Sequence, residues 1–218
     1  IALFGYAHVP WFKKHQRLID EAALPGATER IGLERTARAV LAEFGYEPIG
    51  LDHFARPDDD MAVAAKSGDL HRNFQGYTTD ACDTLIGFGA SSIGQSAAGF
   101  AQNDPDIGRW RKAVEKGRLP IAKGKALDAD DRLRAAIIEK IMCDYAVDLD
   151  AVTAAHGTTV EAVGDAFERL DEPARDGLVT IDGHRLTVTE LGRPLVRIVA
   201  AAFDVYLARA AARHSVAV

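Results

Sequence analysis

Two stretches of the sequence place imidazole and carboxylate groups where they could bind a metal ion. His8 follows an apolar opening run, and Asp52 and His53 follow a second apolar run, with further carboxylates at 58–60. Together these groups suit zinc or iron, which would indicate a metal-dependent hydrolase. The sequence has neither an HxH pair nor an HExxH motif. The alternative interpretation is that these side chains are hydrogen-bonded structural groups or helix caps.

The densest cluster of polar side chains is the segment 71–79, whose sequence is HRNFQGYTT. Amide, guanidinium, imidazole, phenol and hydroxyl groups surround Gly76 there, and such a set can hold a polar planar ligand. A structural interpretation is also open, in which the polar residues form a turn while Phe74 and Tyr77 pack. The residue types alone do not decide between the two.

The cysteines of the sequence offer no site of their own. Cys82 and Cys143 are the only two, and they lie far apart. This number and spacing exclude a disulfide framework and any CxxC-type metal site, and they fit a reducing, cytoplasmic setting. We expect both cysteines to be packing residues.

The composition is that of an ordinary folded protein. The 218 residues are 48% hydrophobic and 27% charged, and the formal net charge is −6. This charge gives no broad attraction for nucleic acid or anionic lipid, although a local basic patch is compatible with it. No run approaches the roughly 20 apolar residues that cross a bilayer, and the opening residues lack the basic start of a signal peptide. We therefore expect a cytoplasmic protein without nucleic-acid or membrane partners, whose natural sequence begins upstream of Ile1.

The elements that must position these residues alternate over the first ninety positions. Apolar runs predict strands at 1–9, 48–51 and 84–88, and helical periodicity predicts helices at 28–44 and 58–67. Such alternation is typical of a parallel α/β barrel, in which the loops after the strands build the active site. We therefore expect residues 1–104 to be part of an incomplete TIM-like barrel, whose exposed edges would favour self-association.

The pattern becomes mostly helical after about residue 104. Periodicity predicts helices at 106–116, 128–145, 158–171 and 190–213. The Asp182-Gly183 pair between β-branched runs predicts a hairpin near 178–188. We therefore expect residues 105–218 to form a mostly α-helical C-terminal domain with a winged-helix-like hairpin.

Two long motifs resemble a known family. LDHFARPDDD at 51–60, followed by LHRNFQGYTT at 70–79, resembles oxygen-independent coproporphyrinogen III oxidase, a radical S-adenosylmethionine family. The similarity begins at Tyr6–Pro10 and reaches the FDVY sequence at 203–206, so it covers the whole chain as the C-terminal half of such a protein. The HRNFQGYTT segment favours the oxidases over the related haem chaperones.

This resemblance implies an anaerobic step of haem biosynthesis, the oxidative decarboxylation of coproporphyrinogen III to protoporphyrinogen IX. In that family a [4Fe-4S] cluster and S-adenosylmethionine supply the radical chemistry, and an unidentified acceptor takes an electron. The family's CxxxCxxC motif is absent here, and two cysteines cannot supply three thiolates. We therefore expect this chain to contain no catalytic residue and no metal ligand, to hold neither cofactor firmly, and to be inactive alone.

The resemblance also assigns ligand-binding residues. It implies that Ala7 contacts the cluster-bound S-adenosylmethionine and that Phe74, Gln75 and Ile93 line a second S-adenosylmethionine site. The candidates for binding the substrate carboxylates are two cations that lie beside the two motifs. They are Arg56 and Arg72, for which a structural ion pair with nearby aspartates is the alternative.

Two other functional classes remain as alternatives. A haem-carrying chaperone with the same barrel would use His71 or His53 as an axial ligand. A winged-helix module would bind DNA through the helix at 158–171, with 182–185 as its wing. That helix carries four acidic residues against the single Arg169, so the sequence favours a scaffold role over DNA binding.

Overall fold

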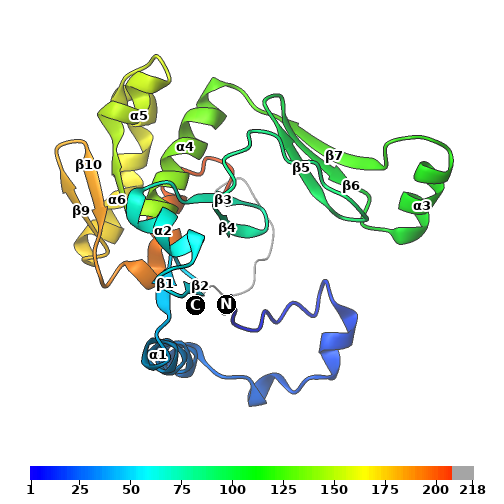
Figure 1. Cartoon of the computed structure of the whole chain (residues 1–218), viewed down its shortest axis with the longest axis horizontal. Coiled ribbons are helices and arrows are strands. Elements are labelled where there is room, and N and C mark those ends of the chain that lie inside the picture. The colour runs from blue at the N-terminus through cyan, green and yellow to red at the C-terminus, as the bar shows by residue number, and fades with distance from the viewer. Residues whose placement is uncertain (208–218) are drawn as a thin grey trace.

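The computed structural model describes residues 1–207, in which short antiparallel sheets alternate with helices (Figure 1). The helices are α1 Ala27–Glu43, α2 Asp60–Ser67, α3 Ile107–Glu115, α4 Ala129–Asp144, α5 Leu149–Ala155, α6 Asp165–Arg175 and α7 Val196–Ala201. The strands are β1 Glu47–Ile49, β2 His53–Ala55, β3 His71–Asn73, β4 Gly76–Thr78, β5 Ile93–Ser96, β6 Gly99–Asn103, β7 Ile121–Ala126, β8 Ala146–Asp148, β9 Val179–Asp182 and β10 Arg185–Val188. Within this described part, no helix is both long and apolar enough to span a membrane.

The three strands expected in the first half do not pair with one another in parallel within residues 1–207. The strand pairings among residues 1–207 are all antiparallel. The segments 1–9 and 84–88 form only the single bridges Ala2–His53 and Leu85–Gln95. The segment near 48–51 becomes a hairpin, because Gly50 has a positive φ of 57° and reverses the chain within a few residues. A parallel neighbour would instead need a crossover of a dozen residues or more.

The predicted helices at 28–44, 58–67, 106–116 and 128–145 are confirmed as α1, α2, α3 and α4. The apolar stripe of α1 is not buried, however, since Leu33 is 62% exposed and Phe44 is 69% exposed. Asp59 caps the first turn of α2 through its carboxylate, and Gly68 ends that helix with a φ of 80°. The acidic run at 58–60 thus contributes a helix cap, as one interpretation of the sequence expected.

The main hydrophobic core lies in the C-terminal part of the chain. It joins α4, α6, α7 and the three-stranded sheet, whose strand order is β8-β10-β9. Three aliphatic residues of α4 at helical spacing, Leu133, Ile137 and Ile141, are almost fully buried in it. The hairpin predicted near 178–188 is confirmed as β9 and β10, and Gly183 in its turn has a φ of 57°.

Two predicted helices of this region have different bounds. The segment 158–171 is a 3₁₀ turn at Val160–Val163 followed by α6, while α5 was not predicted. The helix expected at 190–213 is α7, which ends at Ala201. Beyond α7, the Asp204 carboxylate accepts hydrogen bonds from the Tyr206 and Leu207 amides, as the N-cap of a new turn does. Positions 208–213 of the predicted helix lie outside the described residues.

A buried arginine joins α4 to α6 in this core. The Arg134 guanidinium, 7% exposed, lies 2.8 Å from an Asp165 oxygen and 2.9 Å from an Asp130 oxygen. Its hydrogen bonds are the main cause that lowers the pKa of Asp165. Because the folded-state pKa lies below the unfolded one, this interaction stabilises the fold above the unfolded-state pKa and is lost as pH falls through the folded-state value.

We therefore predict that Asp165→Asn destabilises the protein at neutral pH by about 1 kcal/mol or less, since Asp165 is partly exposed to solvent. The difference from the unmodified protein should shrink when the pH is lowered below about 4. Urea unfolding at both pH values measures it, with the exposed Asp171→Asn as control. A difference that did not change with pH would show that the ion pair contributes nothing.

Candidate functional site

The segment 71–79 forms a hairpin that presents two residues at its tip. Strands β3 and β4 are paired from His71 with Thr78 to Asn73 with Gly76, which leaves Phe74 and Gln75 as the loop. The Asn73 carboxamide oxygen accepts a hydrogen bond from the Gln75 amide at 2.8 Å. Asn73 thus serves turn chemistry, as the structural interpretation proposed, while the Phe74 and Gln75 side chains are exposed.

Tyr77 anchors the base of this hairpin to the rest of the protein. Its ring is 5% exposed, and its hydroxyl donates to the Met142 carbonyl at 2.9 Å and accepts from the Leu51 amide at 3.0 Å. Met142 lies in the last turn of α4, where carbonyls have no partner within the helix. Burial raises the pKa of Tyr77, so the phenol remains a neutral donor at physiological pH. The anchor therefore fixes the hairpin to α4 and to the β1–β2 turn.

At the other end of the hairpin, Phe74 packs against the β5–β6–β7 sheet. Its ring meets that of Phe100 edge to face with 5.0 Å between centroids, although Phe74 is still 53% exposed. Phe100 and Gln102 of β6 pair with Gln95 and Ile93 of β5, respectively. Gln95 and Ile93 are two positions apart, so they point to the same face. Directly paired residues share one face of a sheet, so Ile93 and Phe100 lie on the same face. The structure thus places Phe74 and Ile93, two of the residues assigned to one site, at the same sheet face, and Gln75 follows Phe74 in the loop.

Ala7 lies in a separate, extended segment at the N-terminus. Its carbonyl accepts a hydrogen bond from the Gln16 side chain at 3.0 Å, and that side chain also accepts from the Val9 amide. Gln16, although polar, is 9% exposed because it fills this turn. These bonds hold residues 7–16 together, and none of the contacts found within residues 1–207 brings Ala7 to the hairpin tip.

The two candidate arginines lie over aromatic rings. The Arg56 guanidinium is 5.9 Å from the Tyr46 ring centroid, and that of Arg72 is 5.5 Å from the Tyr77 ring centroid. Both side chains are exposed. In the described part of the chain neither forms the ion pair with an aspartate that was the structural alternative. Stacking of this kind holds a guanidinium in place while its N–H groups stay free to bind a carboxylate.

A half-buried acid-base pair lies beneath the hairpin, hydrogen-bonded as one interpretation of the sequence expected. The Asp52 carboxylate accepts from His53 Nδ1 at 2.8 Å, and its other oxygen is 3.6 Å from Arg197. The His53 ring lies edge-on to Tyr77 at 5.3 Å. A Cβ at Gly76 would come within 2.9 Å of this ring, so the glycine permits the close packing. Asp52 and His53 are neighbours in the sequence, but their contacts with Arg197 and Tyr77 join segments that are distant in it.

The side chains proposed for a hydrolase-type metal site are not assembled into one. His8 contacts Glu21 and His53 contacts Asp52. Within residues 1–207, no three His, Cys, Asp or Glu side chains are grouped as a metal site requires. The cysteines do not fit an iron-sulfur cluster either, because cluster ligation needs at least three thiolates and the sequence has two cysteines, of which Cys82 is exposed and Cys143 is buried. Burial also raises the pKa of the Cys143 thiol to about 12.

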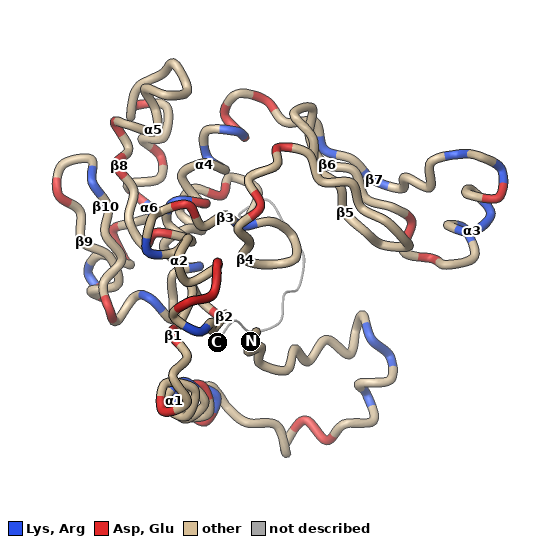
Figure 2. Tube along the Cα trace, viewed as in Figure 1, with Lys and Arg blue, Asp and Glu red and all other residues tan. Residues whose placement is uncertain are grey.

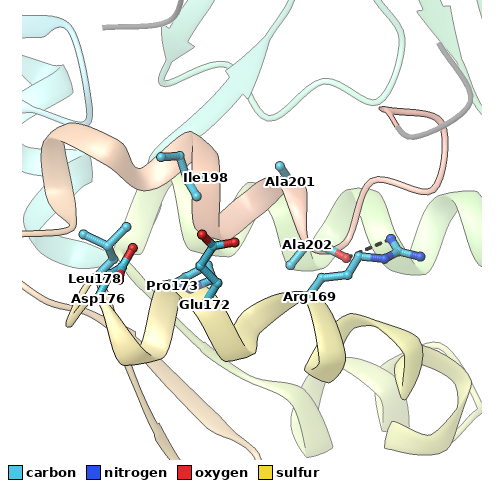
Figure 3. Close-up of a pocket in the computed structure, with 8 residues that line it drawn as sticks. All are labelled: Arg169, Glu172, Pro173, Asp176, Leu178, Ile198, Ala201 and Ala202. Atoms are coloured by element: carbon cyan, nitrogen blue, oxygen red, sulfur yellow. Dashed lines mark hydrogen bonds between the residues drawn. The ribbon is translucent and has the colours of Figure 1, made fainter. Parts of the chain in front are cut away.

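A pocket also lies between α6 and α7, away from these residues (Figure 3). Its volume is about 350 Å³, and its lining includes Arg169, Glu172 and Ile198. Arg169 is held by the Ala202 carbonyl at 3.1 Å and by Asp165 at 2.6 Å. None of the residues assigned from the sequence lines this pocket.

Comparisons with known proteins match the whole chain to one group. Residues 127–195 match the family model described as HemN C-terminal domain. The chain is 51% identical to an oxygen-independent coproporphyrinogen III oxidase of Bradyrhizobium diazoefficiens and 42% identical to one of Paracoccus denitrificans, in each case over 100% of this chain and 48% of that protein. A solved structure of coproporphyrinogen III oxidase (HemN) from Escherichia coli, titled as a radical SAM enzyme, superposes with a TM-score of 0.88 at 35% identity, over 94% of this chain and 48% of that one. The chain therefore spans about half the length of the curated relatives it matches.

Proposed function

We propose that this chain is the C-terminal part of an oxygen-independent coproporphyrinogen III oxidase. The chain is homologous to the C-terminal half of these enzymes, and its residues 127–195 match the HemN C-terminal domain family. The complete enzyme would oxidatively decarboxylate coproporphyrinogen III to protoporphyrinogen IX in the cytoplasm. A [4Fe-4S] cluster and S-adenosylmethionine would supply its radical chemistry, and an electron acceptor would take up the electron that the substrate releases.

The observation that carries this proposal is the arrangement of the β3–β4 hairpin. Phe74 and Ile93 provide apolar surface on one sheet face, and Phe100 backs it. The Gln75 amide next to them can both donate to and accept from a ligand. We assign these residues to the binding of an S-adenosylmethionine molecule, whose adenine, ribose and amino acid parts require such a mixed surface. Ala7 would contact the other S-adenosylmethionine molecule, the one that is bound to the cluster.

The residues of this chain do not fit the cluster itself, so its thiolate ligands would have to come from outside residues 1–218. We therefore propose that the chain alone does not catalyse the reaction. Its contribution would be to bind and orient, with Arg56 and Arg72 offering guanidinium groups to the propionate carboxylates of the substrate. Both are exposed and held only by stacking, which leaves their N–H groups available.

The C-terminal unit supports a scaffold role within this proposal. Its elements run α4, β8, α5, α6, β9, β10, and in the sheet β10 lies between β8 and the edge strand β9, an order consistent with a winged helix. The helix that would read DNA, α6, exposes carboxylates, and its Arg169 is engaged by Asp165. We propose residues 105–218 as this scaffold domain and residues 1–104 as part of the enzyme's barrel, whose uncovered edges would allow the chain to self-associate.

The two alternatives of other classes are not favoured by the comparisons. The imidazoles that a haem chaperone would use are engaged by carboxylates, His71 by Glu139 at 3.2 Å and His53 by Asp52 at 2.8 Å. Both hydrogen bonds use Nδ1 and leave Nε2 open, so the contacts themselves do not decide the question, and the comparisons carry the preference.

We predict that Phe74→Ala weakens the binding of S-adenosylmethionine by roughly tenfold, because the adenine would lose an aromatic wall and its edge-to-face support. Equilibrium dialysis with labelled S-adenosylmethionine measures the effect on this chain and on the full-length protein. Phe88→Ala is the matched control, since Phe88 is 87% exposed and lies outside the proposed surface. Equal affinity of both variants for the ligand would remove Phe74 from the site.

A further inference from the structure

Residues 104–126 form an arm, here called the basic arm, that projects from the rest of the chain (Figure 1). Helix α3 lies at its far end, and β7 returns from it along the edge of the β5–β6–β7 sheet. The six residues of β7 are all exposed. The arm therefore reaches solvent over most of its length.

The charge of this arm is opposite to that of the whole chain. Residues 107–126 contain seven Lys or Arg residues and one acidic residue, whereas the chain as a whole has a net charge of −6. Two of these cations are paired, Arg109 with Asp104 at 2.7 Å and Lys125 with Asp131 at 3.1 Å. The other five have no acidic partner within residues 1–207, and Figure 2 shows basic segments gathered around α3. They are Arg111, Lys112, Lys116, Arg118 and Lys123.

Apolar side chains accompany these cations. At helical spacing, Ile107, Trp110 and Val114 lie on one side of α3, Lys112 lies on the opposite side, and Arg111 borders the apolar side next to Ile107. Ile107 is 64% exposed and Val114 is 47% exposed. Beyond the helix, Leu119 is 80% exposed and Ile121 is 50% exposed. This is a basic amphipathic surface whose apolar side has no cover in the described structure.

We propose that the basic arm binds the surface of an anionic membrane. Lys and Arg side chains near such a surface are each attracted to its lipid headgroups, and exposed aliphatic side chains gain free energy when they enter the boundary between headgroups and acyl chains. A phosphate backbone would attract the cations but would leave the aliphatic residues without a partner. The acidic remainder of the chain opposes binding weakly, because its charges are screened beyond about 10 Å.

This proposal revises the expectation that the chain has no membrane partner, which was based on the net charge of the whole sequence. That net charge conceals a local excess of cations on a projecting element. The proposal does not depend on the enzymatic function, and its test requires neither cofactor nor activity.

Vesicle flotation tests the proposal directly. The chain should bind vesicles made of equal parts phosphatidylcholine and phosphatidylglycerol but not vesicles of phosphatidylcholine alone. The triple substitution Arg111→Gln, Lys112→Gln, Lys116→Gln should weaken this binding by at least about tenfold. The control neutralises three basic residues of another exposed segment, Lys13→Gln, Lys14→Gln, Arg17→Gln, and should keep most of the affinity. An absence of binding to anionic vesicles, or equal losses in both variants, would overturn the proposal.

A second measurement examines the apolar side of α3. The sequence has two tryptophans, so Trp11→Phe leaves Trp110 as the only one. Its fluorescence emission should shift to shorter wavelength when anionic vesicles are added, because the indole enters a less polar environment. Circular dichroism confirms that each variant is folded. An emission maximum that stayed constant while the chain was bound would contradict the proposed insertion.

Discussion

Phe203→Ala is expected to destabilise the protein by about 3–5 kcal/mol, a large part of the stability of a domain of this size. Phe203 is fully buried at 0% exposure in the core that joins α4, α6 and α7. Its removal leaves a cavity that the surrounding helices fill only in part, which adds to the lost burial of the ring. Urea unfolding followed by circular dichroism measures the effect.

Phe88→Ala provides the control for that experiment, because it removes the same side chain from a position that is 87% exposed. Its effect should lie within about 0.5 kcal/mol of zero. If both substitutions had similar small effects, Phe203 would not be a core residue, and the packing of α7 against α4 would be wrong.

Tyr77→Phe is expected to cost about 1–3 kcal/mol although it removes a single oxygen atom. The Leu51 amide and the Met142 carbonyl would both lose the hydroxyl that pairs with them in a buried environment. Because these bonds fix the hairpin to α4, the substitution should also weaken S-adenosylmethionine binding at the hairpin tip.

Thermal and urea unfolding measure the stability of this variant, and equilibrium dialysis measures its ligand affinity. Tyr46→Phe is the control, since the Tyr46 ring remains in place beneath Arg56 and no buried hydrogen bond is lost. Reduced stability with unchanged ligand affinity would show that Tyr77 supports the fold but not the proposed site.

Most of the helices could be predicted from the sequence because their signals are local. Asp59 and Gly68 mark the ends of α2 by a side-chain cap and a positive φ, and both features depend on neighbours within a few positions. The hairpin at β9–β10 was equally clear, since an Asp-Gly turn between β-branched runs allows few other structures.

The sheets of the first half could not be predicted in the same way. Apolar runs indicate strands but not their partners, and the run at 84–88 meets only Gln95 in a single bridge. Strands β5, β6 and β7 contain glycine, glutamine and lysine at positions where the pattern expects apolar residues, because β7 is exposed throughout and β5 and β6 are only half-buried.

The candidate site likewise has a part that could be predicted from the sequence and a part that could not. The tip residues Phe74 and Gln75 follow from the motif at 70–79, and Ile93 follows from the resemblance to the family. Their supports, Phe100 and the Met142 carbonyl, do not follow from either, since these contacts join segments far apart in the sequence. The contact of Asp52 with Arg197 could not be predicted for the same reason.

We propose that this chain is the C-terminal half of an anaerobic coproporphyrinogen III oxidase and is inactive without the cluster-bearing half. A chimera tests this proposal, in which this chain replaces the corresponding 48% of the Bradyrhizobium diazoefficiens relative. Release of carbon dioxide from labelled coproporphyrinogen III is measured without oxygen, with S-adenosylmethionine, a reductant and an electron acceptor present. We expect release by the chimera and none by the chain alone. A folded chimera that carries its cluster and cleaves S-adenosylmethionine but releases no carbon dioxide, or activity of the chain by itself, would refute the proposal.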